Sequence, residues 1–389
     1  MIAIRNAKVV LEHGILFDGV ILVENDRIIT LGKSGEVEIP SCAQTVDAKG
    51  AYVGPGFVDI HVHGGNRHFF YAEPEEAAEY FLSHGETTVM ATLYYDLSKE
   101  DFLESIGRVK TAMQSDGPGK AIGGFYMEGP YMNPKYGASP EKNKWRGEIR
   151  REDYADILAE AGELARVWAV APERDGIEAF VKDAKATNPA AVFSVGHSEA
   201  TPEQIRKLKK YGLCLQTHSL NATGRSNETM AGVRGCGPDE ACLADHEMYA
   251  ELISDSQGIH VHPDMQRLMV EIKGVDRLIL ISDSFVSEAE SPDYLRHIKD
   301  LVYDDNGYLS GSKLTMDMAC KNIMSHTSVG ICQAFLMASR NPARVLGMDD
   351  EIGTVEPGKK ANLVFVDDQF HVQKVMLEGV FRRAFVEKE

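Results

Sequence analysis

The sequence has few cysteines, and none of them stands in a Cys-x-x-Cys pair. The six are scattered through the chain, which argues against a zinc ribbon or a disulfide framework and is typical of reduced thiols in a cytoplasm. No apolar run approaches the roughly 20 residues that cross a bilayer. The first residues lack the apolar core and cleavage site of a secretory signal. The sequence therefore predicts a cytoplasmic protein without a membrane segment.

Basic residues are also in short supply. Lys and Arg total 41 against 59 Asp and Glu, a formal charge of −18, so nucleic acid is not an expected partner, although a local pocket can still bind a small anion. The glycine-rich loops of nucleotide-binding folds, Gly-x-Gly-x-x-Gly and Gly-x-x-x-x-Gly-Lys, do not occur. With 389 residues, 43% of them hydrophobic, the chain is long enough for one large catalytic domain and a smaller module.

The two ends of the chain share a sequence pattern that the middle lacks. Short β-like runs separated by turn residues lie at 2–10, 20–23 and 27–29, and again at 361–366 and 375–381. The first three runs look like a small antiparallel sheet. Residues 1–54 and 347–389 are therefore predicted to form one small discontinuous β-sandwich domain that both termini close.

Residues 55–346 alternate between short apolar runs and helical stretches. Apolar runs of this length suit buried parallel strands, and eight βα repeats predict a (β/α)8 TIM-type barrel as the catalytic domain. Periodicity alone does not separate a barrel from an open doubly wound sheet. The expected strands are 57–63, 87–93, 121–128, 167–173, 192–197, 213–218, 250–255 and 278–283, and the clearest helices are 74–83, 151–161 and 201–211.

Ionisable residues gather where the predicted strands end. These residues are His61, His63, Glu128, His197, His218 and Asp283. The carboxyl ends of barrel strands form the face on which barrel enzymes build their sites. A single buried histidine is more often a hydrogen-bonded core residue than a ligand, but six such residues at the same ends favour a common site.

The residue types indicate a metal centre. Imidazole and carboxylate are the usual protein ligands of Zn²⁺ and Fe²⁺, and His61 and His63, two apart on a strand, point to the same side. We therefore expect one or two divalent ions, held by these two histidines together with Glu128, His197 and His218. Asp283 is then placed to take a proton from the attacking water and pass it to a leaving group.

Longer blocks of sequence resemble the amidohydrolase superfamily, and within it the family of N-acetylglucosamine-6-phosphate deacetylases. The resemblance covers nearly the whole chain. The His-x-His block is common to the superfamily, whereas the Glu-Gly-Pro block and the Leu-Ser-Gly-Ser run are more particular to the deacetylases. The matching blocks are 55–64, 127–134, 171–173, 196–198, 217–222, 258–262, 282–283, 309–316 and the segment from 341 to 363.

The resemblance implies a role for each matching position. It assigns metal binding to Glu128, His197 and His218, with His61 and His63 supporting a second metal, and acid and base catalysis to Asp283. It also implies a homodimer in which an arginine of the loop after the sixth strand holds the phosphate, often of the neighbouring subunit; Arg234 is favoured over Arg225. The remaining implied substrate contacts are Ala138, Ser139, Asn221, Ala222, His260, Leu309, Ser310 and Gly311.

The chain departs from the family pattern near the sugar. Ser139 stands where the family usually has a histidine, Thr223 stands where methionine is common, and Ser284 follows Asp283 in place of alanine. The leading hypothesis is deacetylation of an N-acetylhexosamine 6-phosphate, with N-acetylglucosamine 6-phosphate first and another N-acylated amino sugar, such as N-acetylgalactosamine 6-phosphate, as the alternative. The alternative of a catalytically silent scaffold would require that metal-ligand residues had been lost, whereas here every ligand position and Asp283 are filled. A carbamylated lysine is not expected, because Glu173, and not a lysine, stands at the end of the expected fourth strand.

Overall fold

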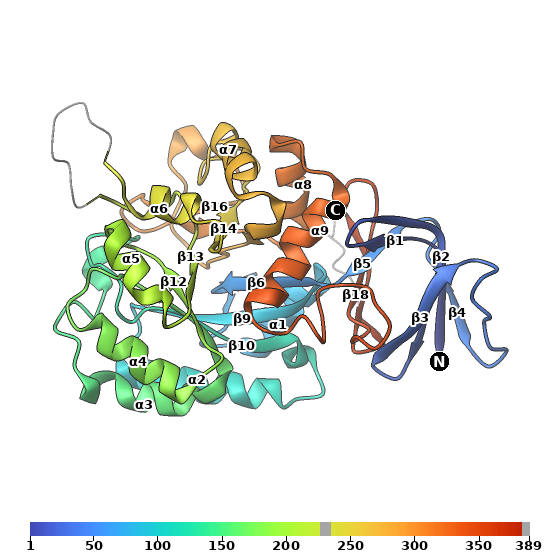
Figure 1. Cartoon of the computed structure of the whole chain (residues 1–389), viewed down its shortest axis with the longest axis horizontal. Helices are drawn as coiled ribbons and strands as arrows, with labels where there is room; N and C mark the ends of the chain where they lie inside the picture. The colour runs from blue at the N-terminus through green and yellow to red at the C-terminus, as the bar shows by residue number, and fades with distance from the viewer. Residues whose placement is uncertain (226–234, 383–389) are drawn as a thin grey trace.

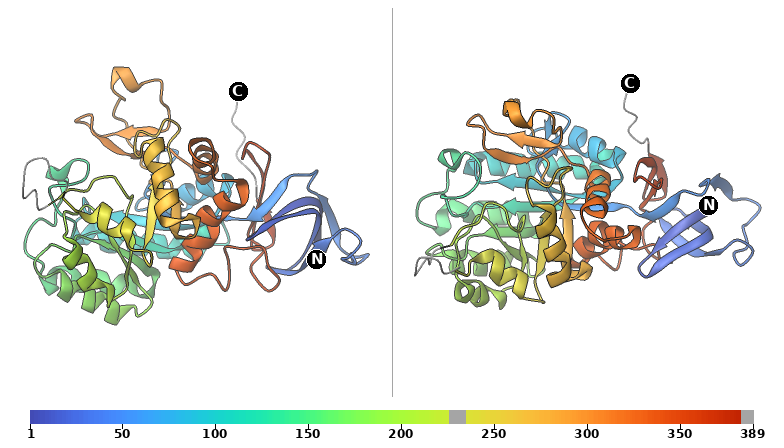
Figure 2. Two further views of the ribbon diagram at one scale, coloured as in Figure 1. Left: turned by 45° about the horizontal axis from the view of Figure 1, so that its top comes forward. Right: turned by 90° about the horizontal axis from the view of Figure 1, so that it is seen from above.

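The computed structural model describes residues 1–225 and 235–382. Within them the chain forms two large sheets and two short hairpins. One large sheet is a parallel barrel with helices around it, and the other stands beside it and contains the N-terminus (Figure 1). Figure 2 shows that this second sheet lies at one end of the long axis of the molecule.

The barrel strands follow one another round the sheet in chain order. Each pairs in parallel with the next. A doubly wound sheet would reverse its strand order partway, so the predicted (β/α)8 barrel is confirmed. The strands are β6 (Phe57–Val62), β9 (Glu86–Tyr94), β10 (Ile122–Glu128), β11 (Ala165–Val170), β12 (Val192–Val195), β13 (Leu213–Gln216), β14 (Tyr249–Ile253) and β15 (Leu278–Ile281).

The barrel closes between β15 and β6. The backbone N–H of Asp283 donates to the carbonyl of His61 at 3.0 Å. The carboxylate of Asp59 accepts hydrogen bonds from the backbone and the hydroxyl of Ser282, and it accepts another from the N–H of His61 at 3.1 Å. Asp59 is fully buried. Its hydrogen bonds connect the first barrel strand to Ser282, which directly follows the last barrel strand.

Helices follow the strands and cover the outside of the barrel. Helix α2 begins with a capping box in which the Ser98 hydroxyl accepts from the N–H of Asp101, and α5 begins with the same device at Thr201. The predictions for 74–83 and 151–161 match α1 and α3 at both ends. The helices are α1 (Pro74–Ser83), α2 (Lys99–Met113), α3 (Arg151–Ala161), α4 (Ile177–Thr187), α5 (Pro202–Lys209), α6 (Pro238–Ala244), α7 (Pro263–Lys273), α8 (Met316–His326), α9 (Ile331–Phe335) and α10 (Asn341–Val345).

Short elements complete the chain between these helices. Two hairpins, β7 (Gly64–Gly65) with β8 (His68–Phe69) and β16 (Leu301–Tyr303) with β17 (Leu309–Ser312), stand in the loops after β6 and β15. The single turns are η1 (Pro118–Ala121), η2 (Pro140–Lys142), η3 (Gly162–Leu164), η4 (Val275–Arg277) and η5 (Asp293–Leu295), and η6 (Leu336–Arg340) is a π-helical turn.

Strands from both ends of the chain form the second sheet. Strand β18 pairs antiparallel with β5 and so joins the two ends, around a shared core that includes Ile4, Val53 and Phe365. The division of the chain into 1–54 with 347–389 and 55–346 remains our proposal. The strands are β1 (Ile2–Leu11), β2 (Gly14–Glu24), β3 (Arg27–Lys33), β4 (Gln44–Asp47), β5 (Tyr52–Pro55), β18 (Leu363–Val366), β19 (Val372–Leu377) and β20 (Val380–Arg382).

The expected antiparallel pairing of the first three β-like runs is confirmed, but the sheet that they belong to is not purely antiparallel. Strands β1, β2 and β3 pair antiparallel as expected. However, β1 also pairs in parallel with β4 and with β5, so the sheet is mixed. The sequence pattern missed this because the partners of β1 on its other edge arrive only after a long connection, and turn residues report hairpins but not such pairs.

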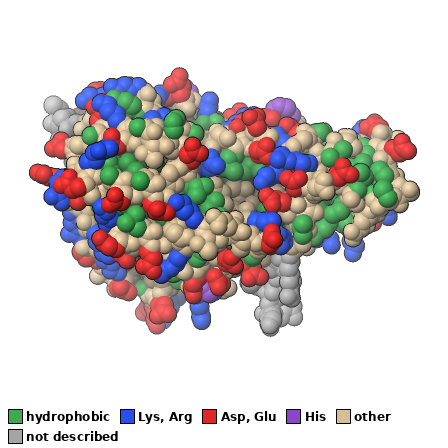
Figure 3. All heavy atoms as spheres, turned by 90° about the horizontal axis from the view of Figure 1, so that it is seen from below, with side chains coloured by type: hydrophobic (Ala, Val, Ile, Leu, Met, Phe, Trp, Pro, Cys, Tyr) green, Lys and Arg blue, Asp and Glu red, His purple; other side chains and the backbone are tan. Residues whose placement is uncertain are grey.

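Charges of both signs are interspersed over the face drawn in Figure 3, while hydrophobic side chains gather on the narrow end that the second sheet forms. Exposed apolar residues of that sheet include Phe17 and Ile29. Within the described ranges, none of the helices combines the length and the apolar character needed to cross a membrane.

Candidate active site

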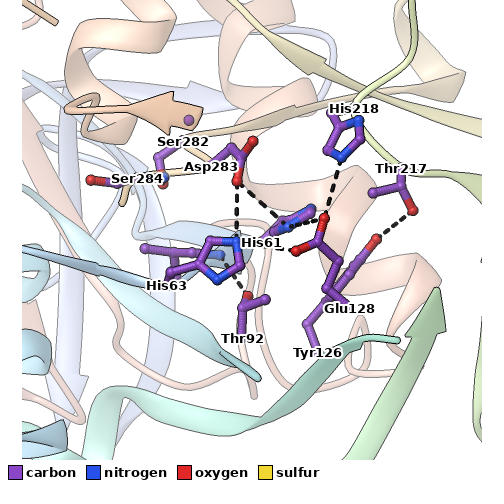
Figure 4. A network of polar contacts seen from close by, with 12 residues as sticks. His61, His63, Thr92, Tyr126, Glu128, Thr217, His218, Ser282, Asp283 and Ser284 are labelled. Carbon is purple, nitrogen blue, oxygen red and sulfur yellow. Dashed lines mark hydrogen bonds and ion pairs between the residues drawn. The ribbon is translucent and has the colours of Figure 1, made fainter. Parts of the chain in front are cut away.

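Five of the barrel strands bring their ionisable residues to one point. His61 lies in β6, His63 follows it, and Glu128 is the last residue of β10. His197 and His218 come two residues after β12 and β13, and Asp283 comes two residues after β15. Figure 4 shows the side chains of His61, His63, Glu128, His218 and Asp283 gathered in one place. The structure thus gathers all six residues at the carboxyl end of the barrel, as the sequence predicted.

Glu128 lies at the centre of two groups of ligand atoms. One group is His61, His63 and Glu128, the other is Glu128, His197 and His218, and in each the ligand atoms lie within 4.8 Å of one another. Oε1 of Glu128 is 2.8 Å from Nε2 of His197 and 3.3 Å from Nε2 of His218. Oε2 is 3.4 Å from Nε2 of His63. A carboxylate in this position can bridge two ions.

The donor set fits divalent metal. Nε2 of His197 lies 3.1 Å from Nε2 of His218, and two imidazole nitrogens at this distance cannot both direct a proton at the other. A cation between them and Glu128 would bind both lone pairs. In the first group, the buried Nε2 of His61 has no hydrogen-bond partner among the described residues.

The electrostatics of the site also favour a cation. Burial by itself lowers the pKa of His61, but the carboxylates of Asp283, Glu251 and Glu128 outweigh burial and raise that pKa to about 10. Positive charge is therefore stabilised where the ring points. Burial raises the pKa of Asp283, whereas the neighbouring histidines, His61 first, lower it by more, so the net direction is down. Asp283 accordingly stays a carboxylate, 3.3 Å from Nε2 of His63.

Three of these residues have a left-handed backbone. The φ angles are 42° at His197, 25° at His218 and 45° at Asp283. Such a conformation costs a non-glycine residue about 1–3 kcal/mol and persists where the surroundings enforce it. Here the chain leaves a strand and turns sharply, which aims the side chain across the barrel mouth. Positive φ angles also occur at non-glycine residues far from the site, such as Asn6 and Phe370, but these three belong to residues that would do the chemistry.

Sequence reasoning missed Glu251, which orients the ligands. This residue lies in β14 and is fully buried. Its Oε2 accepts from Nδ1 of His61 at 3.1 Å and from the backbone N–H of His218 at 3.0 Å. The bond to Nδ1 leaves Nε2 of His61 free of a proton for a metal. A charged residue inside an otherwise apolar strand was the signal that could have found it.

A cavity of about 540 Å³ opens above the metal ligands. Most of the predicted substrate contacts line it, namely Ala138, Ser139, Asn221, Ala222, Leu309, Ser310 and Gly311. Aromatic rings form one wall, where Phe285 packs edge-on against His63 and Tyr94. Lys142 is the single Lys or Arg among the described lining residues.

Two of the predicted contacts also have hydrogen-bond partners within the protein. Ser139 is 4% exposed, and its hydroxyl donates to Asp304 at 2.8 Å, so this side chain ties two loops together. His260 lies beside the cavity, where Asp255 binds its Nδ1 at 3.0 Å and its Nε2 faces the carbonyl of Gly311 at 3.2 Å. Its ring thus contacts the hairpin that lines the cavity.

The two candidate arginines also differ. Arg225 forms an ion pair with Glu240 at 2.5 Å and does not line the cavity. Arg234 lies outside the described residues, so its predicted phosphate contact stays a prediction.

A parallel barrel that gathers four imidazoles and two carboxylates at the carboxyl ends of its strands defines a metal-dependent hydrolase. The chain belongs to the amidohydrolase family, whose sequence profile matches residues 52–382. Divalent metal is the usual cofactor of this family.

Individual relatives extend the comparison over the whole chain. The chain is 31% identical to N-acetylgalactosamine-6-phosphate deacetylase of Escherichia coli O157:H7 over 84% of this chain and 86% of that protein. It is 27% identical to N-acetylglucosamine-6-phosphate deacetylase of Bacillus subtilis (strain 168), covering 99% and 98%.

Solved structures share the fold at similar coverage. The N-acetylglucosamine-6-phosphate deacetylase of Pasteurella multocida superposes with a TM-score of 0.85 at 23% identity, over 98% of this chain and 99% of that one. A variant of the Mycobacterium smegmatis enzyme in complex with N-acetyl-D-glucosamine-6-phosphate has a TM-score of 0.80 and 25% identity, covering 98% of both chains.

Proposed function

We propose that the protein hydrolyses the acetamide of an N-acetylhexosamine 6-phosphate, with N-acetylglucosamine 6-phosphate as the leading substrate. The products are acetate and the amino sugar phosphate. One observation carries the proposal: Glu128 is shared by two complete groups of ligand atoms, and Asp283 lies beside them at the floor of a sugar-sized cavity. The deacetylase names of the most similar relatives support the choice of reaction.

The metal would be Zn²⁺ or Fe²⁺, because both accept imidazole and carboxylate ligands. His61, His63 and Glu128 would hold one ion, and Glu128, His197 and His218 the other. When bound, divalent metal polarises the amide carbonyl and makes the attacking water more acidic. Glu251 fixes the ring of His61 through Nδ1, which keeps its other nitrogen directed at the site.

Asp283 would move the proton. Its carboxylate accepts a proton from the attacking water and then gives it to the amide nitrogen as the C–N bond breaks. One water is consumed, the acyl carbon gains its oxygen, and the amine leaves with the proton. The lowered pKa of Asp283 keeps its carboxylate ionised, which is the form that can accept a proton.

The β16–β17 hairpin would hold the acetyl group. Leu309, Ser310 and Gly311 line the cavity from this hairpin, and Ser312 donates its N–H to the carbonyl of Asp283 at 2.9 Å. A backbone hydrogen bond therefore connects the hairpin that would hold the acetyl group to Asp283. The backbone of Asn221 and Ala222 would face the phosphate.

The phosphate needs more positive charge than the described lining offers. Lys142 is accompanied there by Asp96, Asp304 and Asp305. Arg234 is our proposed phosphate ligand, with Arg225 as the competitor, and a homodimer would let this loop reach a neighbouring subunit. A cytoplasmic location is likewise proposed, on the strength of the free cysteines.

A specific observation favours the second sugar. The relative with 31% identity is named for N-acetylgalactosamine 6-phosphate, and Ser139, Thr223 and Ser284 depart from the usual family residues. The alternative of a silent scaffold is weakened by the full ligand set.

A mass-spectrometric screen of N-acylated sugar phosphates with metal-replete protein tests the proposal. We expect loss of the acetyl group from N-acetylglucosamine 6-phosphate or its galacto epimer, with much slower turnover of the unphosphorylated sugars. The same protein stripped of metal is the control. Absence of turnover for every sugar phosphate would overturn the proposed function.

A further inference from the structure

Asp96 is a cavity residue that the mechanism above does not use. It lies two residues after the end of β9, at the same carboxyl end of the barrel as the metal ligands, and it lines the cavity. Its Oδ1 is buried and has no hydrogen-bond partner among residues 1–225 and 235–382. The carboxylate thus offers an acceptor that the described protein leaves unused.

The other carboxylates of the cavity are all engaged. Glu128 and Asp283 face the histidines, Asp304 accepts from Ser139, and Asp305 pairs with Lys142. The two lysines whose charges act on Asp96 form their ion pairs with other carboxylates: Lys142 lies 3.4 Å from Asp305, and Lys144 lies 3.4 Å from Asp101. Tyr95, the neighbouring residue, donates its hydroxyl to the carbonyl of Ala138 at 3.2 Å.

An unpaired carboxylate in this position destabilises the fold. Burial raises the pKa of Asp96 to about 6, although Lys142 acts in the opposite direction. Removing a charged oxygen from water without a hydrogen bond in return costs free energy, and buried polar groups without partners are uncommon in proteins. Because Oδ1 itself is buried, a ligand donor in the cavity would stabilise the charge of Asp96 from the side of the carboxylate that lines the cavity.

The surroundings of Asp96 suit a sugar. Phe69 stacks on Tyr71 with ring centroids 4.7 Å apart, and both line the cavity together with Tyr94 and Phe285. Ligand pockets combine such apolar walls with a few polar groups that fix orientation. Aromatic faces can cover the C–H side of a pyranose ring while a carboxylate takes one of its hydroxyls.

We propose that the carboxylate of Asp96, which lines the cavity, accepts a hydrogen bond from a ring hydroxyl of the substrate and thereby selects between epimeric hexosamines. This inference rests on the proposed function and adds a specificity residue to it. An ionised carboxylate can only accept, so the hydroxyl must point at it. An epimer that turns the hydroxyl away leaves the carboxylate without this hydrogen bond.

The test compares one sugar with its deoxy analogues. We would measure kcat/KM of the wild type and of Asp96→Ala for the preferred N-acetylhexosamine 6-phosphate, its 3-deoxy and 4-deoxy analogues and its C4 epimer. For the wild type, one hydroxyl should matter, with a loss of roughly 10- to 100-fold when it is removed, the range for a hydrogen bond to a charged group. In Asp96→Ala that loss should vanish.

Two further variants guard the interpretation. Asp96→Asn keeps the shape and a weaker acceptor, so the loss should shrink without vanishing, and this variant serves if Asp96→Ala does not fold. Asp305→Ala removes another carboxylate of the same cavity, 80% exposed, and should keep the wild-type loss.

The outcomes are distinct. If each deoxy analogue suffers the same loss in wild type, Asp96→Ala and Asp96→Asn, Asp96 does not contact a hydroxyl and the inference is wrong. If the wild type turns over none of these sugars, the proposed function fails, and the inference falls with it.

Discussion

Oε2 of Glu251 lies 3.1 Å from Nδ1 of His61, and neither side chain is exposed to solvent. The pair joins strands β14 and β6 across the barrel interior. The same oxygen accepts the backbone N–H of His218, so one carboxylate orients a ligand from each of the two groups that share Glu128.

We predict that Glu251→Ala lowers metal affinity by about 10- to 100-fold, the usual effect of losing a partner that orients a metal ligand. Metal content after dialysis against graded chelator is the measurement, and it needs no activity. Glu251→Gln is the matched control, because it retains an oxygen of nearly the same position and should lose less. Equal metal retention in wild type and Glu251→Ala would contradict the role.

Asp283→Asn should lower kcat by at least about a hundredfold, since general acid and base catalysis is typically worth 10²–10⁴. The substitution preserves shape but removes the acceptor of the proton. Metal content and thermal unfolding of the variant check that the site is still assembled. Turnover close to that of the wild type would show that another group moves the proton.

Arg234→Ala should raise KM for the phosphorylated sugar far more than for the unphosphorylated sugar. A guanidinium makes paired, charge-assisted bonds to phosphate that alanine cannot replace, and Lys142 is the single cation of the described lining. Arg225→Ala is the matched control, because Arg225 is paired with Glu240. A larger effect from Arg225→Ala would identify the other arginine as the phosphate ligand.

Asp96→Asn should stabilise the protein at neutral pH. Burial raises the folded pKa to about 6 from an ordinary value of 3.8, so the folded state binds more protons than the unfolded state between these values. Wild-type stability therefore falls as pH rises through this window, and a neutral amide escapes the loss. Thermal unfolding at pH 7.5 should show a higher Tm for Asp96→Asn, and the difference should shrink near pH 4.

Asp305→Asn is the control for this measurement, because its side chain is 80% exposed and ion-paired with Lys142, and it should change Tm little at either pH. A Tm gain for Asp96→Asn that is equal at both pH values would show that the buried charge is not its cause.

The sequence by itself determined the barrel and the main site residues. Buried parallel strands are short apolar runs, and in a barrel their carboxyl ends meet on one face. Residues as distant as His61 and Asp283 therefore had to converge once the repeat was recognised. The order of the apolar runs along the chain, with ionisable residues at their carboxyl ends, was enough to predict this convergence, and the structure agrees.

Only the tertiary structure decided which groups act on those residues. Glu251 stands within an apolar run, and its two hydrogen bonds depend on which strands become neighbours. Ser139 occupies a position expected to contact the substrate, yet the hairpin that brings Asp304 alongside engages its hydroxyl. Asp96 has no sequence motif at all. Asp96 stands out because the described part of the folded chain places no hydrogen-bond donor beside its Oδ1. Side chains that are distant in sequence become neighbours only through packing, and no local sequence pattern encodes that packing.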